Sequence, residues 1–425
     1  MEDGVYQRTT LPNGLRILTA PMPQTRSVSV SIYIGAGSRY ETQEQCGLSH
    51  FVEHLCFKGT ERLPTAQAIS EVIDSVGGII NAATDRELTV FYCKVARPHF
   101  ELALDVLADL VRRPLFAPDE LEKERRVVME ELAMIADFPS QQVEVLLDET
   151  VWPDQPLGRD VAGTEATVKA LSRETALDYF RRQYVPNNAV VSVAGAVDPQ
   201  EVAGRIACAL SEWCPGAPGG WFPAVDSQHE PRVAIKYKAT EQAHLSLAVR
   251  GLPLQHPDRY ALSLLSVILG EGMSSRLVQE LRERRGLCYD VHSYLSFFQD
   301  TGAFAVYAGV DPSRARETLG ALVMELARLR DDGVSDEELA RAKELAKGRL
   351  LLRMEDTRSV SDWLGGQELL MGQVRTVDEV TEKIDALTGD DLRRVARQLV
   401  VSNQLNLAAV GPFRSGRRFL SLLRL

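Results

Sequence analysis

The chain has 425 residues, more than one ordinary hydrophobic core accommodates, so we expect at least two domains. Its hydrophobic fraction of 45% and charged fraction of 25% are typical of a soluble globular protein. The formal net charge of −11 argues against nucleic acid as the main partner, because phosphate binding needs a basic face. Peptides that are neutral or basic remain compatible with this charge.

The cysteines and the N-terminal segment indicate where the protein is located. The six cysteines are scattered without a C-x-x-C pair, which argues against a disulfide framework or a cysteine zinc site. Residues 1–7 are acidic and lack the basic and apolar regions of a targeting signal. No apolar run approaches the roughly 18 residues that span a membrane. We therefore expect a cytoplasmic protein without a membrane partner.

The N-terminal residues predict strands followed by a buried helix. Residues 5–19 are typical of two short strands joined at Pro12-Asn13-Gly14, and the alternation in 27–36 predicts a third strand. Glycine and serine then interrupt the pattern, and residues 47–60 predict a helix. Its apolar residues are Leu48, Phe51, Val52, Leu55 and Phe57.

Two histidines and a glutamate stand close together in that helix. His50 and His54 are four residues apart, so one helical face presents both imidazoles to one metal ion. Glu53 lies at the edge of this face, from where it can reach a water molecule without binding the metal. The pattern is that of an H-x-x-E-H zinc site. The competing interpretation, a polar patch or a pair of core histidines, is weakened because no other pair among the seven histidines has helical spacing.

A third metal ligand is expected on another helix, because catalytic zinc usually has three protein ligands and one open position. Residues 118–136 predict such a helix, and its Glu124 and Glu131 are two turns apart on one face. We choose Glu131 as the ligand and Glu124 as a hydrogen-bond partner of a ligand histidine. Spacing alone leaves Glu122 and Glu130 as alternatives, since acidic helix faces are usually solvated.

The remaining elements lead to a break in composition. Between and after the two helices just described, further helices are predicted at 64–76, 98–112, 140–150 and 173–184, and strands at 79–82, 88–95 and 189–196. Residues 214–223 are rich in glycine and proline, which is typical of a linker. We therefore predict an N-terminal metal-binding domain at 1–213, a linker at 214–229 and a C-terminal domain at 230–425.

The C-terminal part repeats features of the N-terminal part. Residues 387–393 resemble 171–177 (387 − 171 = 216), and residues 335–343 resemble 118–125 at a similar offset in numbering. This indicates a duplication of a whole domain. Each half mixes helices with antiparallel hairpins, so we predict an α+β fold of two homologous two-layer domains.

The two halves differ where the metal would bind. We align the histidine-bearing helix with residues 272–281, which contain no histidine, and Glu131 with Arg349 (349 − 131 = 218). The second half therefore lacks the ligands for the same metal, as expected of one catalytic and one supporting half.

The motifs together resemble those of the inverzincin metallopeptidases, the family of pitrilysin, insulin-degrading enzyme and mitochondrial processing peptidase. The resemblance rests on His50-Phe-Val-Glu53-His54 with Glu131 downstream (131 − 54 = 77), and it covers nearly the whole chain. Further matching segments are Gly59-Thr60, Gly77-Gly78, Asn81-Ala82, Pro156-Leu157-Gly158 and Gly163-Thr164. The resemblance implies one half-shell of a peptidase chamber, as in short bacterial-type members.

The resemblance also implies roles for individual residues. His50, His54 and Glu131 would bind one Zn²⁺ per chain, and Glu53 would be the general base. Arg282 and Tyr289 lie in a segment similar to one that holds the substrate at the site of the opposing half-shell, and Asn81 and Ala82 match an edge strand that pairs with an extended peptide. From the residues alone, Arg282 lies in the basic last turn of a helix that ends at Gly286. Tyr289 then begins a strand.

The function implied by the resemblance is that of a zinc-dependent endopeptidase for peptides or unfolded segments. A homodimer is expected, because one half-shell carries both the metal site and the Arg282/Tyr289 segment. Two alternatives come from the same family, a non-catalytic scaffold subunit and the catalytic subunit of a heterodimer with an inactive homologue. Retention of the metal ligands argues against the first alternative, and retention of Arg282 and Tyr289 argues against the second.

Overall fold

The computed structural model describes residues 6–425, which form two compact units. Within the described residues, the first unit comprises 6–132, Asp160–Phe222 and Leu351–Thr376, and the second comprises Ala133–Arg159, Pro223–Leu350 and Val377–Leu425. Val5, where the first strand is predicted to begin, and most of the N-terminal segment judged to lack a targeting signal lie outside the described residues. Within residues 6–425, no helix has both the length and the apolar character needed to cross a bilayer.

A six-stranded mixed sheet with the order β1-β2-β6-β3-β5-β4 is the centre of the first unit. Its β2 and β6 are parallel, and the other neighbours are antiparallel. The predicted strands are confirmed as β1 (Gln7–Thr10), β2 (Arg16–Pro21), β3 (Ser27–Ile34), β4 (Ile79–Thr84), β5 (Thr89–Ala96) and β6 (Ala189–Gly195). β3 and β6 are almost entirely buried, whereas β4 is half exposed and pairs only with β5 among the described strands.

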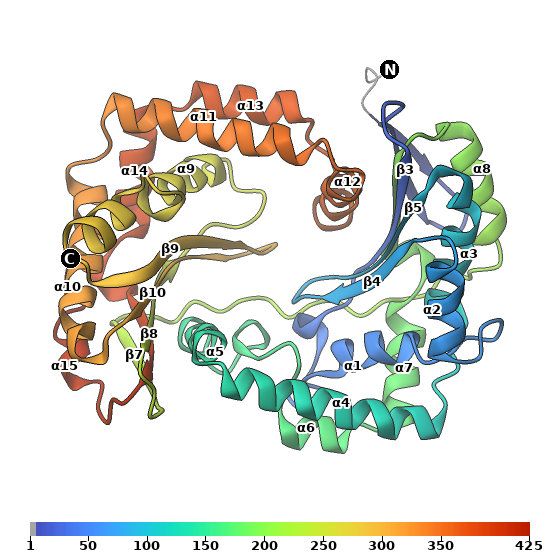
Figure 1. Ribbon diagram of the computed structural model, residues 1–425, viewed down its shortest axis with the longest axis horizontal. Coiled ribbons are helices and arrows are strands. Elements are labelled where there is room, and N and C mark those ends of the chain that lie inside the picture. The colour runs from blue at the N-terminus through green and yellow to red at the C-terminus, as the bar shows by residue number, and fades with distance from the viewer. Residues whose placement is uncertain (1–5) are drawn as a thin grey trace. The chain divides into compact units, whose positions relative to one another are not determined.

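Helices pack on both faces of this sheet (Figure 1). One face contacts the large apolar core, to which β3, α1 and α3 contribute, and the other contacts α12. The helices of the unit are α1 (Leu48–Cys56), α2 (Ala66–Asp74), α3 (Phe100–Arg112), most of α4 (Pro118–Asp137), α6 (Glu165–Ala170), α7 (Arg173–Gln183), α8 (Pro199–Ala209) and α12 (Thr357–Met371).

The second unit repeats this topology. Its strands are β7 (Arg232–Tyr237), β8 (Ala243–Arg250), β9 (Cys288–Phe297), β10 (Gly302–Val310) and β11 (Asn406–Gly411). The order β7-β11-β8-β10-β9 matches β2-β6-β3-β5-β4, with the one parallel pair in the same position. β6 ends at Gly195 and β11 at Gly411, which is the offset seen between the repeated sequences (411 − 195 = 216). The α+β fold is therefore confirmed, and the topology supports the duplication.

Each unit includes a helix from the other half of the chain. α5 (Pro139–Val151) packs on β8 and β11, whereas α12 packs on β3 and β6. The starts of α5 and α12 differ by a similar offset (357 − 139 = 218), so the exchanged helices occupy equivalent positions in the duplication. The compact units are thus not two successive halves of the chain, and the division into 1–213, 214–229 and 230–425 stays a prediction.

The order of elements corrects one alignment made from sequence. The other helices of the second unit include α9 (Arg259–Gly270), the π-helix η5 (Val278–Arg284), α10 (Ala315–Asp331), most of α11 (Asp336–Arg353), α13 (Val377–Ala386), α14 (Gly389–Leu399) and α15 (Arg417–Leu420). α9 is the first α-helix after β8, as α1 is after β3, and η5 precedes β9 as α2 precedes β4. The counterpart of α1 is therefore α9 and not residues 272–281, although α9 also contains no histidine.

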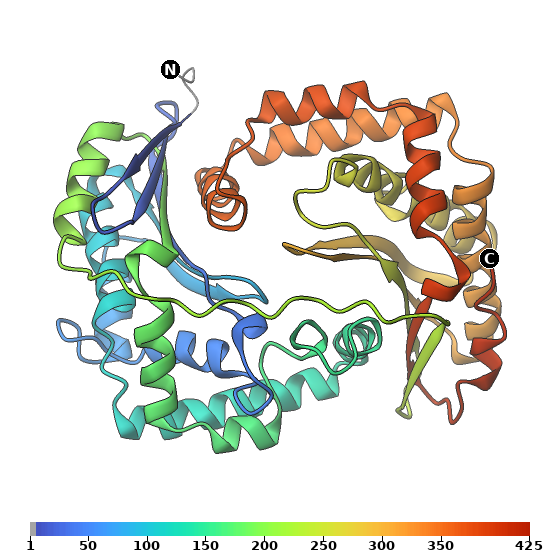
Figure 2. The same ribbon diagram turned by 180° about the vertical axis from the view of Figure 1, so that it is seen from behind.

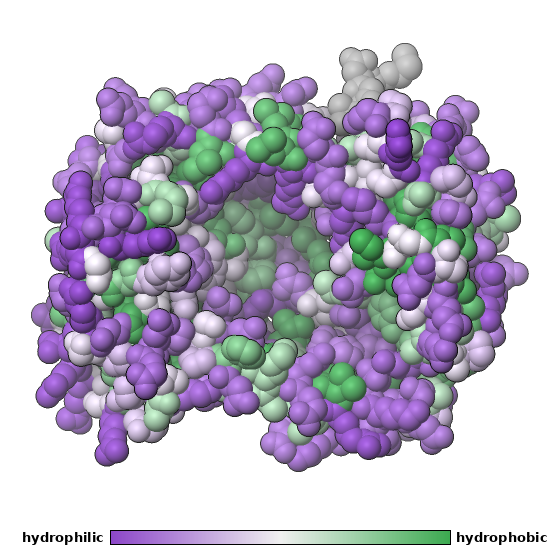
Figure 3. All heavy atoms as spheres, viewed as in Figure 1, coloured by the Kyte–Doolittle hydropathy of each residue, from purple (hydrophilic) through white to green (hydrophobic). Residues whose placement is uncertain are grey.

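Residues 214–230 contain no helix or strand, and Figure 2 shows them as an extended segment. Its Trp221 and Phe222 are fixed to the first unit by the buried side chain of Arg39. The Arg39 guanidinium lies 4.1 Å from the Trp221 ring centroid, and its Nε donates a hydrogen bond of 2.9 Å to the Phe222 carbonyl. Hydrophilic residues cover most of the face in Figure 3.

Two adjacent glycines of α12 test how tightly this helix packs on the first sheet. A Cβ at Gly365 would overlap the ring of buried Tyr33, whereas a Cβ at Gly366 would meet nothing within 4 Å. We expect Gly365→Ala to lower the free energy of unfolding by about 1–3 kcal/mol, because the rigid ring must move. Gly366→Ala should raise it by about 0.5–1 kcal/mol, because alanine favours helix. Urea unfolding of both variants measures the difference, and equal effects would contradict this packing.

Candidate metal centre

The position of the two histidines follows from how α1 is buried. Its apolar side chains Leu48, Phe51, Val52 and Leu55 are completely buried in the core of the first unit. The opposite face therefore presents His50 and His54, whose side chains are 19% and 17% exposed. These side chains are accessible enough to bind a ligand, yet partly shielded from water.

The start of α1 is held by a buried carboxylate. Glu41 is completely buried, and its two oxygens accept hydrogen bonds from the backbone N–H groups of Gly47 at 2.9 Å and Ser49 at 2.6 Å. These N–H groups have no partner inside the helix, so Glu41 acts as its N-terminal cap. Gly47 has φ of 92°, in the left-handed region that favours glycine, and a Cβ there would lie 2.7 Å from the Ala162 carbonyl.

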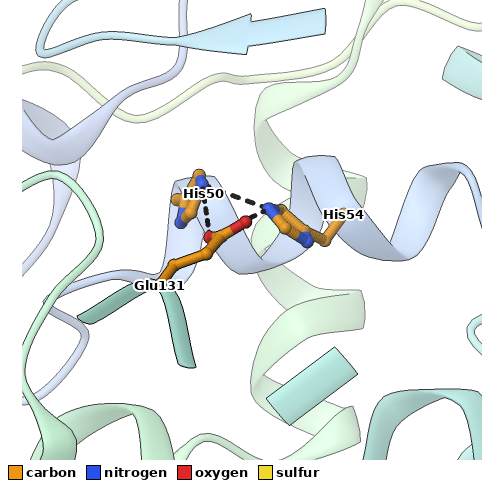
Figure 4. A group of neighbouring side chains, drawn as sticks. All are labelled: His50, His54 and Glu131. Carbon is orange, nitrogen blue, oxygen red and sulfur yellow. Dashed lines mark hydrogen bonds and ion pairs between the residues drawn. The ribbon is translucent and has the colours of Figure 1, made fainter. Parts of the chain in front are cut away.

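The side chain of Glu131 on α4 points at both histidines (Figure 4). The Nε2 atoms of His50 and His54 are 3.2 Å apart, and Glu131 Oε2 lies 3.7 Å from the first and 3.6 Å from the second. Among residues 6–425, these three side chains are the only group of three potential ligands whose donor atoms all lie within 4.8 Å of one another. The other candidates, Glu122 and Glu130, are exposed residues of the same helix.

The separations between these donor atoms fit a tetrahedral metal ion. Zinc binds imidazole nitrogen and carboxylate oxygen at about 2.0–2.1 Å, so tetrahedral ligands are about 3.3 Å apart. The observed separations of 3.2, 3.6 and 3.7 Å require only small side-chain shifts. Burial, and secondarily the charge of His54, lowers the pKa of His50 to about 4. His50 is therefore neutral near pH 7 and able to donate a lone pair.

Glu124 orients the second histidine. Its Oε2 lies 3.1 Å from Nδ1 of His54, and its Oε1 lies 2.8 Å from Nζ of Lys58. A proton on Nδ1 leaves the Nε2 lone pair facing Glu131, as a metal ligand requires. Burial opposes the charged form of Glu124, but the hydrogen bonds from His54 and Lys58 outweigh it and lower the pKa of this carboxyl.

Glu53 lies beside the three potential ligands and is held by a strand. Its Oε2 accepts a hydrogen bond of 2.5 Å from the hydroxyl of Thr84, which is on β4. Burial raises the pKa of Glu53, although the Thr84 hydrogen bond acts in the opposite direction. Glu53, His54 and Glu131 line a pocket of about 490 Å³, together with Ile80 and Asn81 of β4. A carboxylate with a raised pKa therefore faces a pocket large enough for part of a substrate.

Asn81 and Ala82 lie on β4, at the edge of the first sheet. The outer edge of β4 has no strand partner within the described residues. The side chain of Asn81 is exposed, and its Oδ1 accepts a hydrogen bond of 2.8 Å from the N–H of Ala82. Such an edge is suited to pairing with an extended peptide.

Arg282 and Tyr289 lie together in the second unit. Arg282 is on η5, Tyr289 follows at the start of β9, and the guanidinium lies 5.0 Å from the ring centroid of the tyrosine. Tyr289 is 79% exposed, and Gly286 between them has φ of 56°, as expected of a residue that ends a helix. The structure brings these two side chains together, and their action on a substrate stays a prediction.

Three residues of the site were not anticipated from sequence. Lys58 pairs with Glu124, Thr84 hydrogen-bonds Glu53, and Glu41 caps α1. Lys58 stands four residues after His54, so helical spacing could have indicated it. Thr84 and Glu41 carry no such signal, because each reaches its partner through the tertiary fold.

The chain is similar to known proteins over nearly its whole length. Residues 16–165 match the family model described as insulinase (peptidase family M16), and residues 170–345 match the one described as peptidase M16 inactive domain. A Streptomyces coelicolor protein named as an uncharacterized zinc protease is 39% identical over 419 residues, or 97% of this chain and 90% of that protein. A Bacillus subtilis protein of the same designation is 36% identical over 410 residues, or 96% and 98%.

Solved structures show the same fold. A protease from Helicobacter pylori superimposes with a TM-score of 0.90 over 96% of this chain and 99% of that chain, at 24% identity. At this identity the likeness shows the fold alone.

Replacing Glu131 tests the third ligand against its neighbour in the sequence. Removing a residue that only hydrogen-bonds a metal ligand weakens metal binding by up to about 100-fold. Because Glu131 would be a ligand itself, we expect Glu131→Gln to weaken zinc binding by more than about 100-fold. Glu130→Gln should bind zinc like the unmodified protein, because this exposed side chain is not in the cluster. Titration with a competing chelator measures both affinities. Equal affinities, or a loss only in Glu130→Gln, would exclude Glu131 as a ligand.

Proposed function

We propose that this chain, which belongs to the insulinase family of peptidases (peptidase family M16), is a zinc-dependent endopeptidase. The observation that carries the proposal is the convergence of His50, His54 and Glu131 within 4.8 Å, with Glu53 beside them. Two imidazoles and one carboxylate are a usual protein ligand set for catalytic zinc. The relatives named as zinc proteases support the same reaction class.

The chemistry divides between one metal ion per chain and Glu53. Zinc held by His50, His54 and Glu131 would lower the pKa of a water molecule to about 7 and polarise the carbonyl of the peptide bond to be cleaved. Glu53 accepts a proton from the attacking water and passes it to the leaving amine. Its raised pKa suits this transfer, and the Thr84 hydroxyl holds one carboxylate oxygen, so the other would accept the proton. Glu124 keeps His54 in the tautomer that binds metal.

The proposed substrates are peptides or unfolded segments in extended conformation. The edge of β4 at Asn81 and Ala82, which has no strand partner among the described residues, offers main-chain hydrogen bonds to such a segment beside Glu53. Main-chain hydrogen bonds do not depend on the side chains of the peptide. Selectivity between peptide sequences would therefore depend on pockets such as the one lined by Ile80 and Phe57. An extended peptide fits this edge better than a folded protein does, because its backbone groups are available for pairing.

We also infer that the active form is a homodimer in which two half-shells enclose the substrate. By resemblance, Arg282 and Tyr289 of one chain act at the zinc site of the other. The exposure of Tyr289 and its contact with Arg282 support this role, because an exposed phenol beside a cation is available to a substrate oxyanion. A symmetric dimer is also the commonest oligomer.

Glu53→Gln separates proton transfer from metal binding. We expect it to lower kcat by at least about 10²-fold to 10⁴-fold, the usual contribution of a general base. Zinc content should stay at one per chain, because Glu53 is not one of the three ligands. Cleavage of a quenched fluorescent peptide library, with metal analysis of the same samples, measures both quantities. Chelation of the unmodified protein should abolish cleavage, and near-normal turnover in Glu53→Gln with zinc bound would refute the role of Glu53.

Subunit mixing tests the shared sites. Glu53→Gln and Tyr289→Phe should each be poorly active alone. In a mixed dimer one site combines both defects, and the other has intact Glu53 and Tyr289. Mixing should therefore restore up to about half of the normal activity per mixed dimer, by symmetry. Absence of recovery after demonstrated subunit exchange, or full activity of a monomer, would exclude sharing between subunits.

A further inference from the structure

The second unit has a cavity of its own between α9 and α11, two helices that are neighbours in Figure 1. Its volume is about 320 Å³. Apolar side chains from both helices line it, and its polar residues are Glu271, Ser274, Ser275, Glu338 and Arg341. The apolar lining consists of Val267, Ile268, Ala342 and Leu345.

This cavity is the counterpart of the candidate metal centre. α9 corresponds to α1, and the starts of α4 and α11 differ by the same offset as those of α5 and α12 (336 − 118 = 218). At this offset Ala342 takes the place of Glu124, and Arg349 takes the place of Glu131. NH1 of Arg349 forms an ion pair of 2.8 Å with Glu271, so the metal donors of the first unit are replaced by an apolar lining and an internal ion pair. The second unit therefore has a cavity at the equivalent position, but without side chains equivalent to His50, His54 and Glu131.

Among residues 6–425, one positive charge and one buried hydroxyl of the cavity lining have no partner. Ser275 is 4% exposed, and no described residue forms a hydrogen bond with its Oγ. Within residues 6–425, no hydrogen bond, ion pair or ring contact engages the exposed guanidinium of Arg341. The two carboxylates of the lining are already paired, Glu271 with Arg349 and Glu338 with Arg276 at 2.7 Å. A ligand that matches these groups has an apolar body and a negatively charged end.

The size of the cavity limits the ligand further. A volume of about 320 Å³ is at the lower end of the range for ligand pockets, which suits a single amino-acid residue. We propose that this cavity binds the last residue of a peptide, with its aliphatic side chain between α9 and α11 and its C-terminal carboxylate against Arg341 and Ser275. The choice of a peptide rests on the proposed function, because each peptide-bond cleavage creates a new C-terminal carboxylate.

Binding is measured separately from catalysis, on metal-free Glu53→Gln protein. The probe is a fluorescein-labelled Gly-Ala-Ala-Leu peptide with a free C-terminal carboxylate, compared with the same peptide as its C-terminal amide, by fluorescence anisotropy. We expect the amide to bind about tenfold to a hundredfold more weakly, the loss expected for a hydrogen bond to a charged group. Arg341→Gln should remove this preference, and Ser275→Ala should weaken binding of the acid. Arg316→Gln, at an exposed arginine of α10, serves as the matched control and should change nothing.

The possible results distinguish this proposal from the proposed function. Equal binding of acid and amide, or an unchanged preference in Arg341→Gln, would overturn the assignment of the cavity. Equally tight binding of free 4-methylpentanoate would overturn the peptide as ligand and point to a small carboxylic acid. If the unmodified protein cleaves no peptide but the acid-ended probe binds as expected, the proposed function fails while the cavity assignment stands.

Discussion

The burial of one face of α1 is the constraint on which the candidate metal centre depends. Phe51, Val52 and Leu55 are completely buried, so the helix cannot rotate without exposing them to water. Because the histidines stand four residues apart, fixing this rotation fixes both imidazoles toward α4. Glu41 holds the N-terminal end of α1 in place, because its carboxylate accepts hydrogen bonds from the N–H groups of Gly47 and Ser49. The donor geometry is thus a consequence of core packing and capping.

The charges around the histidines favour a cation between them. Glu53, Glu124 and Glu131 bring three carboxylates to the site, and among these only Glu124 has a lysine partner in the described residues. Partly buried carboxylates are destabilised unless an opposite charge is near. Burial keeps His50 uncharged near pH 7, so it cannot supply that charge itself. A divalent ion bound to His50, His54 and Glu131 would offset the repulsion and use the lone pairs of both imidazoles.

The duplication shows how one fold carries different side chains at equivalent positions. Both units keep the same strand order, because sheet pairing and core packing specify it, and each sheet is covered by a helix from the other half of the chain. The residues at the equivalent cavities are not required by the fold and have diverged. In the first unit Glu131 faces two histidines, and in the second Arg349 pairs with Glu271. Fold and site chemistry are therefore separable in this protein.

The sequence by itself determined the α+β class, the duplication and the pairing of His50 with His54, because periodicity of apolar residues and helical spacing are local properties. The sequence limited the candidates for the third ligand to acidic residues of α4, and the family resemblance was needed to select Glu131. Spacing could not select it, because the selection depends on which turn of α4 packs beside α1. The tertiary structure alone decided the exchange of α5 and α12, the correspondence of α9 with α1, and the contacts of Thr84 and Glu41. Each of these depends on residues far apart in the chain, which meet only when the sheets assemble.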